Sequence, residues 1–283
     1  MDYLLSILLG IIEGLTEFLP VSSTAHLRIA EALFGINLAD GYWKMYTIVI
    51  QLGAILCLPV YFRERIQRFA STFPHGEGGD RTMLEHPLSL TLIAFVFTAV
   101  PSLLLVKVIG KHLESLSVMG AALVIGGVVM WVVDKLFARP RTRAMDDMSL
   151  WQAIWIGVCQ ALSAVFPGLS RSMATIAAGQ VAGMSRAAAL EFSFFVSMPT
   201  MVAATGYDLY KTLRPGAENP LGAMHIDAHG WVLLAIGFAV SFAVAYGSVA
   251  WFMNWVRRRG FVPFAVYRIV VGMAVLAWAW GGA

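Results

Sequence analysis

Long apolar runs separated by short polar connectors make up most of the chain, and this pattern predicts an all-α integral membrane protein. A helix needs about 20 apolar residues to cross about 30 Å of hydrocarbon. Six runs have close to that length, at 45–62, 88–109, 117–137, 190–210, 231–254 and 263–281. We therefore expect six transmembrane helices.

Two other apolar stretches, 2–30 and 150–182, are interrupted in the middle by proline, glycine and hydroxyl residues at 20–24 and 167–172. Irregular backbone at membrane depth is tolerated only where it is buried in protein or lines a polar cavity. Each stretch is therefore expected to form a re-entrant helix-loop-helix hairpin, which enters and leaves the membrane on the same side.

The two interrupted stretches resemble each other when the sequence is shifted by 147 residues. This shift places Gly10 on Gly157, Glu13 on Gln160, Thr16 on Ser163, Pro20 on Pro167 and Ser23 on Ser170. Each half then has one hairpin and three crossings, so the second half is inserted upside down, as an inverted-topology repeat. We expect one membrane domain, 1–283, with halves of approximately 1–143 and 148–283. Chance similarity between apolar segments is the competing explanation.

Composition agrees with a membrane location and excludes an ordinary soluble domain. The 283 residues are 59% hydrophobic and 13% charged, and the mean hydropathy is +0.73. A net charge of +3 is too small to indicate binding of nucleic acid, so we expect no such partner. His86, like the other histidines in the connectors, is expected on the surface.

The basic residues predict the orientation of the chain in the membrane. Twelve lie in connectors on one face: Arg63, Arg65, Arg68, Arg81, Lys135, Arg139, Arg141, Arg143, Arg186, Arg257, Arg258 and Arg259. Six lie on the other face: Arg28, Lys44, Lys107, Lys111, Lys211 and Arg214. The positive-inside rule makes the first face cytoplasmic, so both termini and the mouth of the first hairpin face outward. Arg171 and Arg268 fall within the membrane.

Two carboxylates in the first interrupted stretch are the most unusual polar groups. Glu13 and Glu17 are four residues apart and therefore share one face of a helix. In a low-dielectric site, either one carboxylate takes up a proton or a divalent cation neutralises the pair. Mg²⁺ or Ca²⁺ suits oxygen ligands. The alternative is a structural pair that is capped by backbone amides or by a buried arginine.

Hydroxyl groups and a histidine follow these carboxylates. Ser22, Ser23 and Thr24 stand where a new helix begins, so they are either N-caps or, with the free amides, ligands of an anion. His26 comes three residues after Ser23. It is a candidate general base for a serine, or a candidate acid toward a leaving oxygen.

The second interrupted stretch adds a cation to a similar set of groups. Arg171 stands among Gly168, Ser170, Ser172 and Thr175 at a new helix start. Because a guanidinium binds phosphate oxygens in a bidentate way, this arrangement predicts a phosphate-binding site. An ion pair with Glu13 or Glu17 is the structural alternative. Weaker candidates for substrate binding lie near the ends of the spans after each hairpin: Gln51, Glu191 and Ser193.

Four segments resemble the undecaprenyl-diphosphate phosphatases, also called bacitracin-resistance proteins. They are Glu13–His26, Pro167–Ser172, Glu191–Ser193 and Phe261–Arg268. The resemblance implies removal of the terminal phosphate from a C55 isoprenyl diphosphate, which regenerates the monophosphate carrier for peptidoglycan. It also implies a bacterial inner-membrane location, a divalent metal, six spans with two re-entrant hairpins, and an active site open to the periplasm or exterior.

Carried onto this chain, the resemblance implies that Glu13 and Glu17 form the acidic, metal-binding motif and that Arg171 binds the diphosphate. It leaves Ser23, His26 and an activated water open as the nucleophile. The chain departs from the family pattern at Ala25 and Met173, where glycine is usual, and in a spacing from Gln160 to Pro167 that is one residue longer.

The sequence therefore predicts a membrane phosphatase, with a lipid-carrier flippase or transporter as the rival function. Inverted repeats with broken helices are common in transporters that work by alternating access. Gln160 and Ala164 replace Glu13 and Glu17 in the second half, which argues against two equivalent gates. The number of copies is left open, with a homodimer as one candidate assembly.

Overall fold

The computed structural model describes residues 2–36, 41–79, 81–105, 115–213 and 226–281. Within them the chain is helical and has no β-strand, in agreement with the all-α expectation. The helices are α1 (Asp2–Thr16), α2 (Ser23–Leu33), α3 (Gly41–Tyr61), α4 (Arg63–Thr72), η1 (Met83–Glu85), α5 (Pro87–Leu104), α7 (Leu116–Leu136), η2 (Met145–Asp147), α8 (Leu150–Val165), α9 (Arg171–Val181), α10 (Arg186–Leu213), α11 (Ala228–Arg259) and α12 (Val262–Gly281).

Five of these helices are long and apolar enough to cross a membrane: α5, α7, α10, α11 and α12. The sixth candidate is a bent pair, in which Met45–Tyr61 of α3 continues into α4 at an angle of 62°. The run expected at 45–62 is therefore a helix that leads into a second, more polar helix. The run expected at 88–109 ends as a helix at Leu104, and residues 106–114 lie outside the described part of the chain.

Each of the two interrupted stretches forms a pair of helices. We call residues 17–22 the first break, between α1 and α2, and residues 166–170 the second break, between α8 and α9. Both breaks end on a serine N-cap with a positive φ, 75° at Ser22 and 73° at Ser170. Each serine hydroxyl accepts a hydrogen bond from the amide three residues later, which satisfies one free donor of the new helix.

The shared cap geometry changes the register between the two halves. Ser22 corresponds to Ser170, a shift of 148 residues, whereas the sequence comparison paired Ser170 with Ser23. One extra residue after the proline accounts for the difference, because Ser170 follows Pro167 by three positions whereas Ser22 follows Pro20 by two. Ser23 and Arg171 therefore occupy equivalent positions, as the first residues of α2 and α9.

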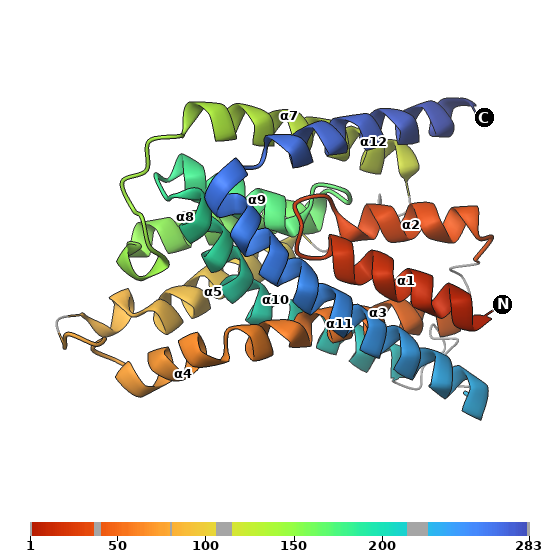
Figure 1. The fold of residues 1–283 in the computed structure, drawn as a ribbon, viewed down its shortest axis with the longest axis horizontal. Coiled ribbons are helices and arrows are strands. Elements are labelled where there is room, and N and C mark those ends of the chain that lie inside the picture. The colour runs from red at the N-terminus through yellow and green to blue at the C-terminus, as the bar shows by residue number, and fades with distance from the viewer. Residues whose placement is uncertain (1, 37–40, 80, 106–114, 214–225, 282–283) are drawn as a thin grey trace.

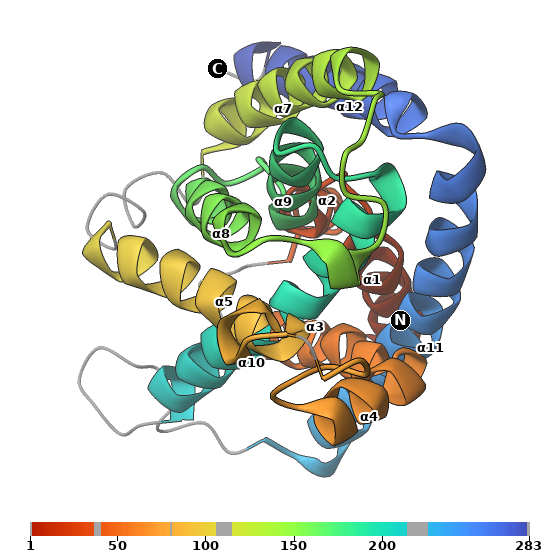
Figure 2. The ribbon, with the colours of Figure 1, turned by 90° about the vertical axis from the view of Figure 1, so that its left-hand side faces the viewer.

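The first helix of each pair packs closely on a long helix from the other half of the chain. Helix α1 lies along α11, and α8 lies along α5 (Figure 2). A Cβ atom at Gly10 would lie 2.9 Å from the Gly237 carbonyl oxygen, and one at Gly157 would lie 2.4 Å from the Ala94 carbonyl oxygen. Only glycine permits these approaches, so the two crossings depend on the same position of each half.

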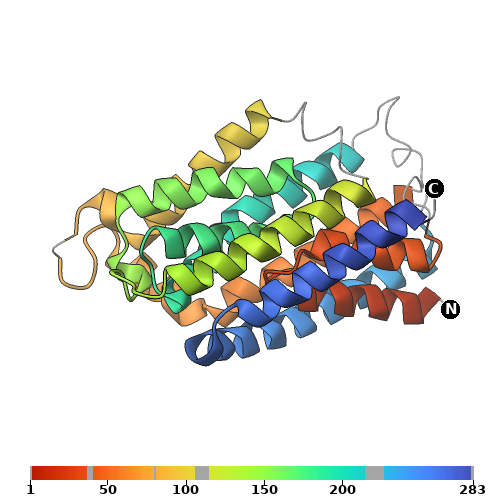
Figure 3. The same ribbon diagram turned by 90° about the horizontal axis from the view of Figure 1, so that it is seen from above.

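Both chain ends lie at one end of the molecule, as Figures 1 and 3 show. Helix α4 and the turn η2, which belong to the arginine-rich connectors, lie at the opposite end (Figure 1). The arginine-rich connectors and the chain ends therefore lie at opposite ends of the molecule. Of the basic residues assigned to the outer face, Lys107, Lys111 and Arg214 lie outside the described part of the chain.

Candidate active site

The first and second breaks lie side by side (Figure 1), and a buried polar cluster joins them. Arg171 Nη2 lies 3.4 Å from Glu17 Oε1, although the two residues are 154 positions apart in the chain. The hydroxyl of Ser172 also donates to the Leu19 carbonyl at 2.9 Å. Glu17 in the first break is thereby joined to Arg171, which directly follows the second break.

The Ser23 hydroxyl donates to Glu17 Oε2 at 2.5 Å. Both residues are buried, with 8% and 7% of their surfaces exposed. A hydroxyl this close to a carboxylate makes a strong, charge-assisted hydrogen bond. Glu17 is therefore the group placed to accept the proton of Ser23, a role for which the sequence had made His26 one candidate.

His26 lies against Tyr267, for which the sequence patterns predicted no role. Its Nδ1 lies 2.8 Å from the Ser22 carbonyl, so Nδ1 carries the proton and donates. Its Nε2 lies 2.8 Å from the Tyr267 hydroxyl and therefore accepts, in the neutral tautomer. The two rings stack with their centroids 5.6 Å apart. Tyr267 lies in the segment 261–268, which carried the family resemblance but had no assigned role.

Glu13 lies one helical turn before Glu17 and is 1% exposed. Neither of its side-chain oxygens has a hydrogen-bond partner in the described part of the chain. A buried carboxylate without a partner is costly, so Glu13 suits either a bound proton or a cation as its neutralising partner. The described residues contain no group of three or more His, Cys, Asp or Glu arranged to hold a metal. Among the described residues, the further ligands of a cation here would be groups other than these side chains, such as hydroxyls, backbone carbonyls, water or phosphate oxygens.

Arg171 has donors to spare. Its Nη1 donates to the Ser193 carbonyl at 3.4 Å, its contact with Glu17 is equally long, and its Nε has no partner among the described residues. The side chain is 13% exposed. Because Arg171 also begins α9, free backbone amides lie nearby. An anion can therefore bind here with only the long contact to Glu17 displaced.

The other polar residues of the second hairpin mainly build its fold. Ser170 and Ser172 share a hydrogen bond of 3.0 Å, and Thr175 Oγ1 lies 2.6 Å from Ser193 Oγ. Gly168 has a φ of 91°, and a Cβ there would lie 2.7 Å from the Met119 carbonyl oxygen. These contacts shape the backbone around Arg171.

Three predicted site residues are not brought into the cluster. Glu191 forms an ion pair of 2.7 Å with Arg65. Residues two apart on a helix point to opposite sides, so Glu191 points away from Arg171 where Ser193 points toward it. Thr24 is exposed. Gln51 lies on α3 and has no hydrogen bond to the cluster within the described residues.

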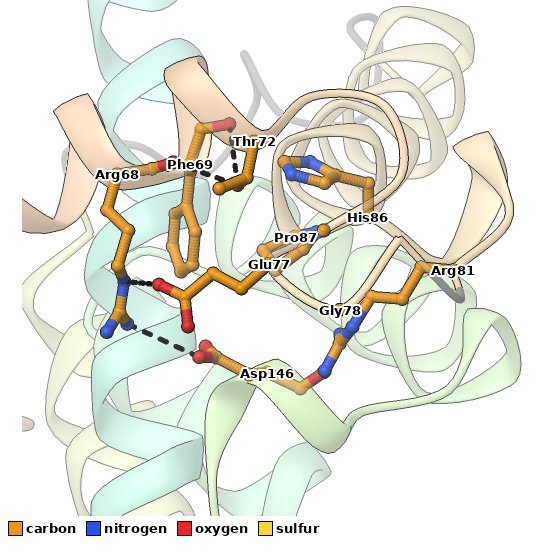
Figure 4. A pocket seen from close by; sticks show the side chains of 10 residues that line it. Arg68, Phe69, Thr72, Glu77, Gly78, Arg81, His86, Pro87 and Asp146 are labelled. Carbon is orange, nitrogen blue, oxygen red and sulfur yellow. Dashed lines mark hydrogen bonds and ion pairs between the residues drawn. The ribbon is translucent and has the colours of Figure 1, made fainter.

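The ion pair of Glu191 is part of a separate network at the arginine-rich end. Arg65 also binds both oxygens of Asp146, at 2.7 and 3.0 Å. Beside this network lies a pocket of about 240 Å³ (Figure 4). His86, which was expected on the surface, is fully buried at its wall, where it caps α5 through Leu88 N. Burial lowers the pKa of His86, which favours the neutral form that this cap requires.

Comparisons with known proteins agree on one family. The family model described as Bacitracin resistance protein BacA matches residues 6–274. An undecaprenyl-diphosphatase of Koribacter versatilis is 70% identical over 280 residues, which are 98% of each chain. Undecaprenyl-diphosphatases of Bradyrhizobium sp. strain BTAi1 and Caldanaerobacter subterraneus are 40% and 39% identical, and the matches cover 99% and 95% of this chain and 98% and 93% of theirs.

Proposed function

The chain belongs to the bacitracin resistance protein family BacA, and from this premise we propose that it is an undecaprenyl-diphosphate phosphatase. It hydrolyses the C55 isoprenyl diphosphate to the monophosphate and inorganic phosphate, for reuse of the cell-wall lipid carrier. The observation that carries the proposal is the meeting of Arg171 with the Glu17–Ser23 pair. These residues supply a phosphate-binding cation and an activated hydroxyl at one buried point.

In the proposed reaction, Arg171 binds the terminal phosphate and exchanges its long contact with Glu17 for phosphate oxygens. Ser23 Oγ attacks the terminal phosphorus while Glu17 accepts the hydroxyl proton. The bond from phosphorus to the bridging oxygen breaks, and the lipid monophosphate leaves. Water then hydrolyses the phosphoserine and releases phosphate, with the proton on Glu17 returned to the Ser23 oxygen. Stabilisation of the phosphoryl charge is the main contribution of the site.

Glu13 and Glu17 are the residues that would hold a divalent cation, Mg²⁺ or Ca²⁺. The two partnerless oxygens of Glu13 fit this role, because Mg²⁺ commonly uses one or two carboxylates and completes its shell with water and substrate phosphate. When bound, the cation would neutralise charge on the diphosphate. It would also remove the repulsion between the two carboxylates.

The proposal includes a multi-pass inner-membrane fold with six spans and two re-entrant hairpins, α1–α2 and α8–α9. Support comes from the packing, in which α1 on α11 matches α8 on α5, and α7 lies along its counterpart α12. The cap serines repeat as well. With the arginine-rich end in the cytoplasm, both termini face the exterior and the first hairpin opens there.

The test is phosphate release from C55 diphosphate by the purified chain in detergent, with and without a chelator. We expect steady turnover that falls at least about tenfold with EDTA and returns with added Mg²⁺ or Ca²⁺. A flippase would release no phosphate, because detergent leaves no second compartment. Turnover that EDTA does not change would remove the metal from the proposal and leave the phosphatase standing.

Tyr267→Phe tests the placement of His26. The substitution removes the hydroxyl that donates to His26 Nε2, a contact of about 1 kcal/mol. Because His26 also bonds the Ser22 carbonyl beside the nucleophile Ser23, we expect phosphate release to fall about fivefold. Tyr246→Phe on α11 is the matched control and is expected to leave the rate unchanged. If Tyr267→Phe lowers phosphate release by the same factor in a His26→Ala background, Tyr267 acts on a group other than His26.

A further inference from the structure

Arg268 of α12 is the largest fully buried side chain among the described residues, and it lies between the two breaks. Its Nη1 donates to the Pro20 carbonyl in the first break at 3.0 Å. Its Nη2 lies 3.0 Å from the Gly168 carbonyl and 2.9 Å from the Leu169 carbonyl in the second break. Nη2 also lies 3.2 Å from the Ala122 carbonyl on α7. One guanidinium therefore contacts both breaks and a third helix.

These carbonyls need an external donor because the breaks interrupt the regular hydrogen bonding of a helix. In a membrane no water replaces the missing donors, so the protein must supply them. A guanidinium has five N–H groups in a fixed plane, which lets it reach several carbonyls at once. The described part of the chain offers Arg268 no carboxylate partner, so carbonyl dipoles alone balance its charge there.

Two other contacts join the breaks directly, and one of them must change during the proposed reaction. Arg171 leaves Glu17 when it binds phosphate, while the Ser172 hydroxyl keeps its bond to Leu19. The bonds of Arg268 go to main-chain carbonyls that take no part in the chemistry. They can therefore persist from the free protein to the substrate complex.

We infer that Arg268 is a positioning residue, which holds the first and second breaks in register so that Arg171 meets the Glu17–Ser23 pair. The inference rests on the proposed phosphatase function for its kinetic consequence, and on the carbonyl contacts for its structural one. Each break folds on its own cap serine, Ser22 or Ser170. The relation between the breaks depends on Arg268, with the single Ser172–Leu19 hydrogen bond beside it.

Gly126 on α7 provides a way to disturb Arg268 without removing it. A Cβ atom at Gly126 would lie 2.4 Å from Arg268 Nη2 and 2.9 Å from Met173 Cε. Alanine is otherwise favourable within a helix. Gly126→Ala therefore pushes on the guanidinium, and Gly247→Ala, where nothing lies within 4 Å of the new Cβ, is its matched control.

The experiment compares Arg268→Lys, Gly126→Ala and Gly247→Ala in detergent, by phosphate release and by hydrogen exchange of residues 17–22 and 166–170. Lysine keeps the charge but cannot span the carbonyls. We expect kcat to fall about 100-fold in the first two variants, with a smaller change in KM. In the same two variants, the backbone amides of both breaks should exchange hydrogen faster than in the wild type. Gly247→Ala should match the wild type in both measurements.

A double-mutant cycle separates positioning from general destabilisation. If Arg268 acts by holding Arg171 against Glu17 and Ser23, Arg268→Lys should change the rate by less than about threefold in an Arg171→Ala background. An equal loss in both backgrounds would overturn the inference, as would normal kcat or unchanged exchange at the breaks. Absence of turnover in the wild type would refute the phosphatase proposal, and the exchange data would still decide the role of Arg268.

Discussion

Glu17→Gln is expected to lower phosphate release by about 10³-fold or more while the protein stays folded. Glutamine cannot accept the Ser23 proton, and general-base catalysis contributes about 10² to 10⁴ in rate. The substitution also removes the negative partner of Arg171. The measurement is kcat for the purified variant, with circular dichroism and gel filtration to show that its fold is intact.

Glu31→Gln is the matched control for this substitution. Glu31 is also a buried carboxylate, 3% exposed, and it forms an ion pair with Arg28 on α2 and no hydrogen bond to Ser23 or Arg171 among the described residues. Its variant should keep turnover within about threefold of the wild type, the small effect usual for a side chain outside the reacting groups. Near-normal kcat in Glu17→Gln would show that Glu17 is not the base.

Arg171→Ala should have the second large effect, a fall of about 10³-fold or more in kcat/KM. The guanidinium is the cation placed to bind the terminal phosphate, and loss of one preorganised donor to a developing charge costs about 10² to 10³ in rate. Because Arg171 also binds the ground-state diphosphate, KM should rise. Steady-state kinetics over a range of lipid concentration would separate the two effects.

The kcat/KM of Arg171→Lys should lie between that of the wild type and that of Arg171→Ala. Lysine keeps the charge and loses the planar, bidentate geometry. Arg257→Ala is the control for the loss of a positive charge, because Arg257 lies in the arginine-rich triplet at the end of α11. Its turnover should equal that of the wild type. Arg171→Ala with kcat/KM within tenfold of the wild type would contradict the assignment of Arg171 to phosphate.

The helices and the two breaks could be predicted because they depend on local sequence. Hydropathy over about 20 residues decides which segments span the membrane, and proline with a cap serine decides where a helix stops and restarts. The first break accordingly contains Pro20 and ends on Ser22, and the second break contains Pro167 and ends on Ser170. The bend between α3 and α4 was missed, since apolar composition alone does not give helix direction.

The hydrogen-bond and ion-pair partners of the site residues could be predicted only in part. Spacing placed Glu13 and Glu17 on one face of a helix, and the repeat suggested that Arg171 would approach them. The same reasoning paired Ser23 with His26 because they are close in sequence, whereas the folded chain gives Ser23 to Glu17 and His26 to Tyr267. Short separation along a chain limits distance but does not choose a hydrogen-bond partner.

The sequence by itself determined the membrane class, the helical segments, the breaks and the chemical types at them, because each follows from the free energy of placing local residues in water or hydrocarbon. The tertiary structure alone decided that Glu191 pairs with Arg65, that His86 is buried, and that Arg268 joins both breaks. Glu191 and Arg65 are 126 positions apart, and Arg268 and Pro20 are 248 apart. The ring of His86 packs on Phe69 and Phe73, across the turn between α4 and α5. Such contacts are fixed by the packing of whole helices.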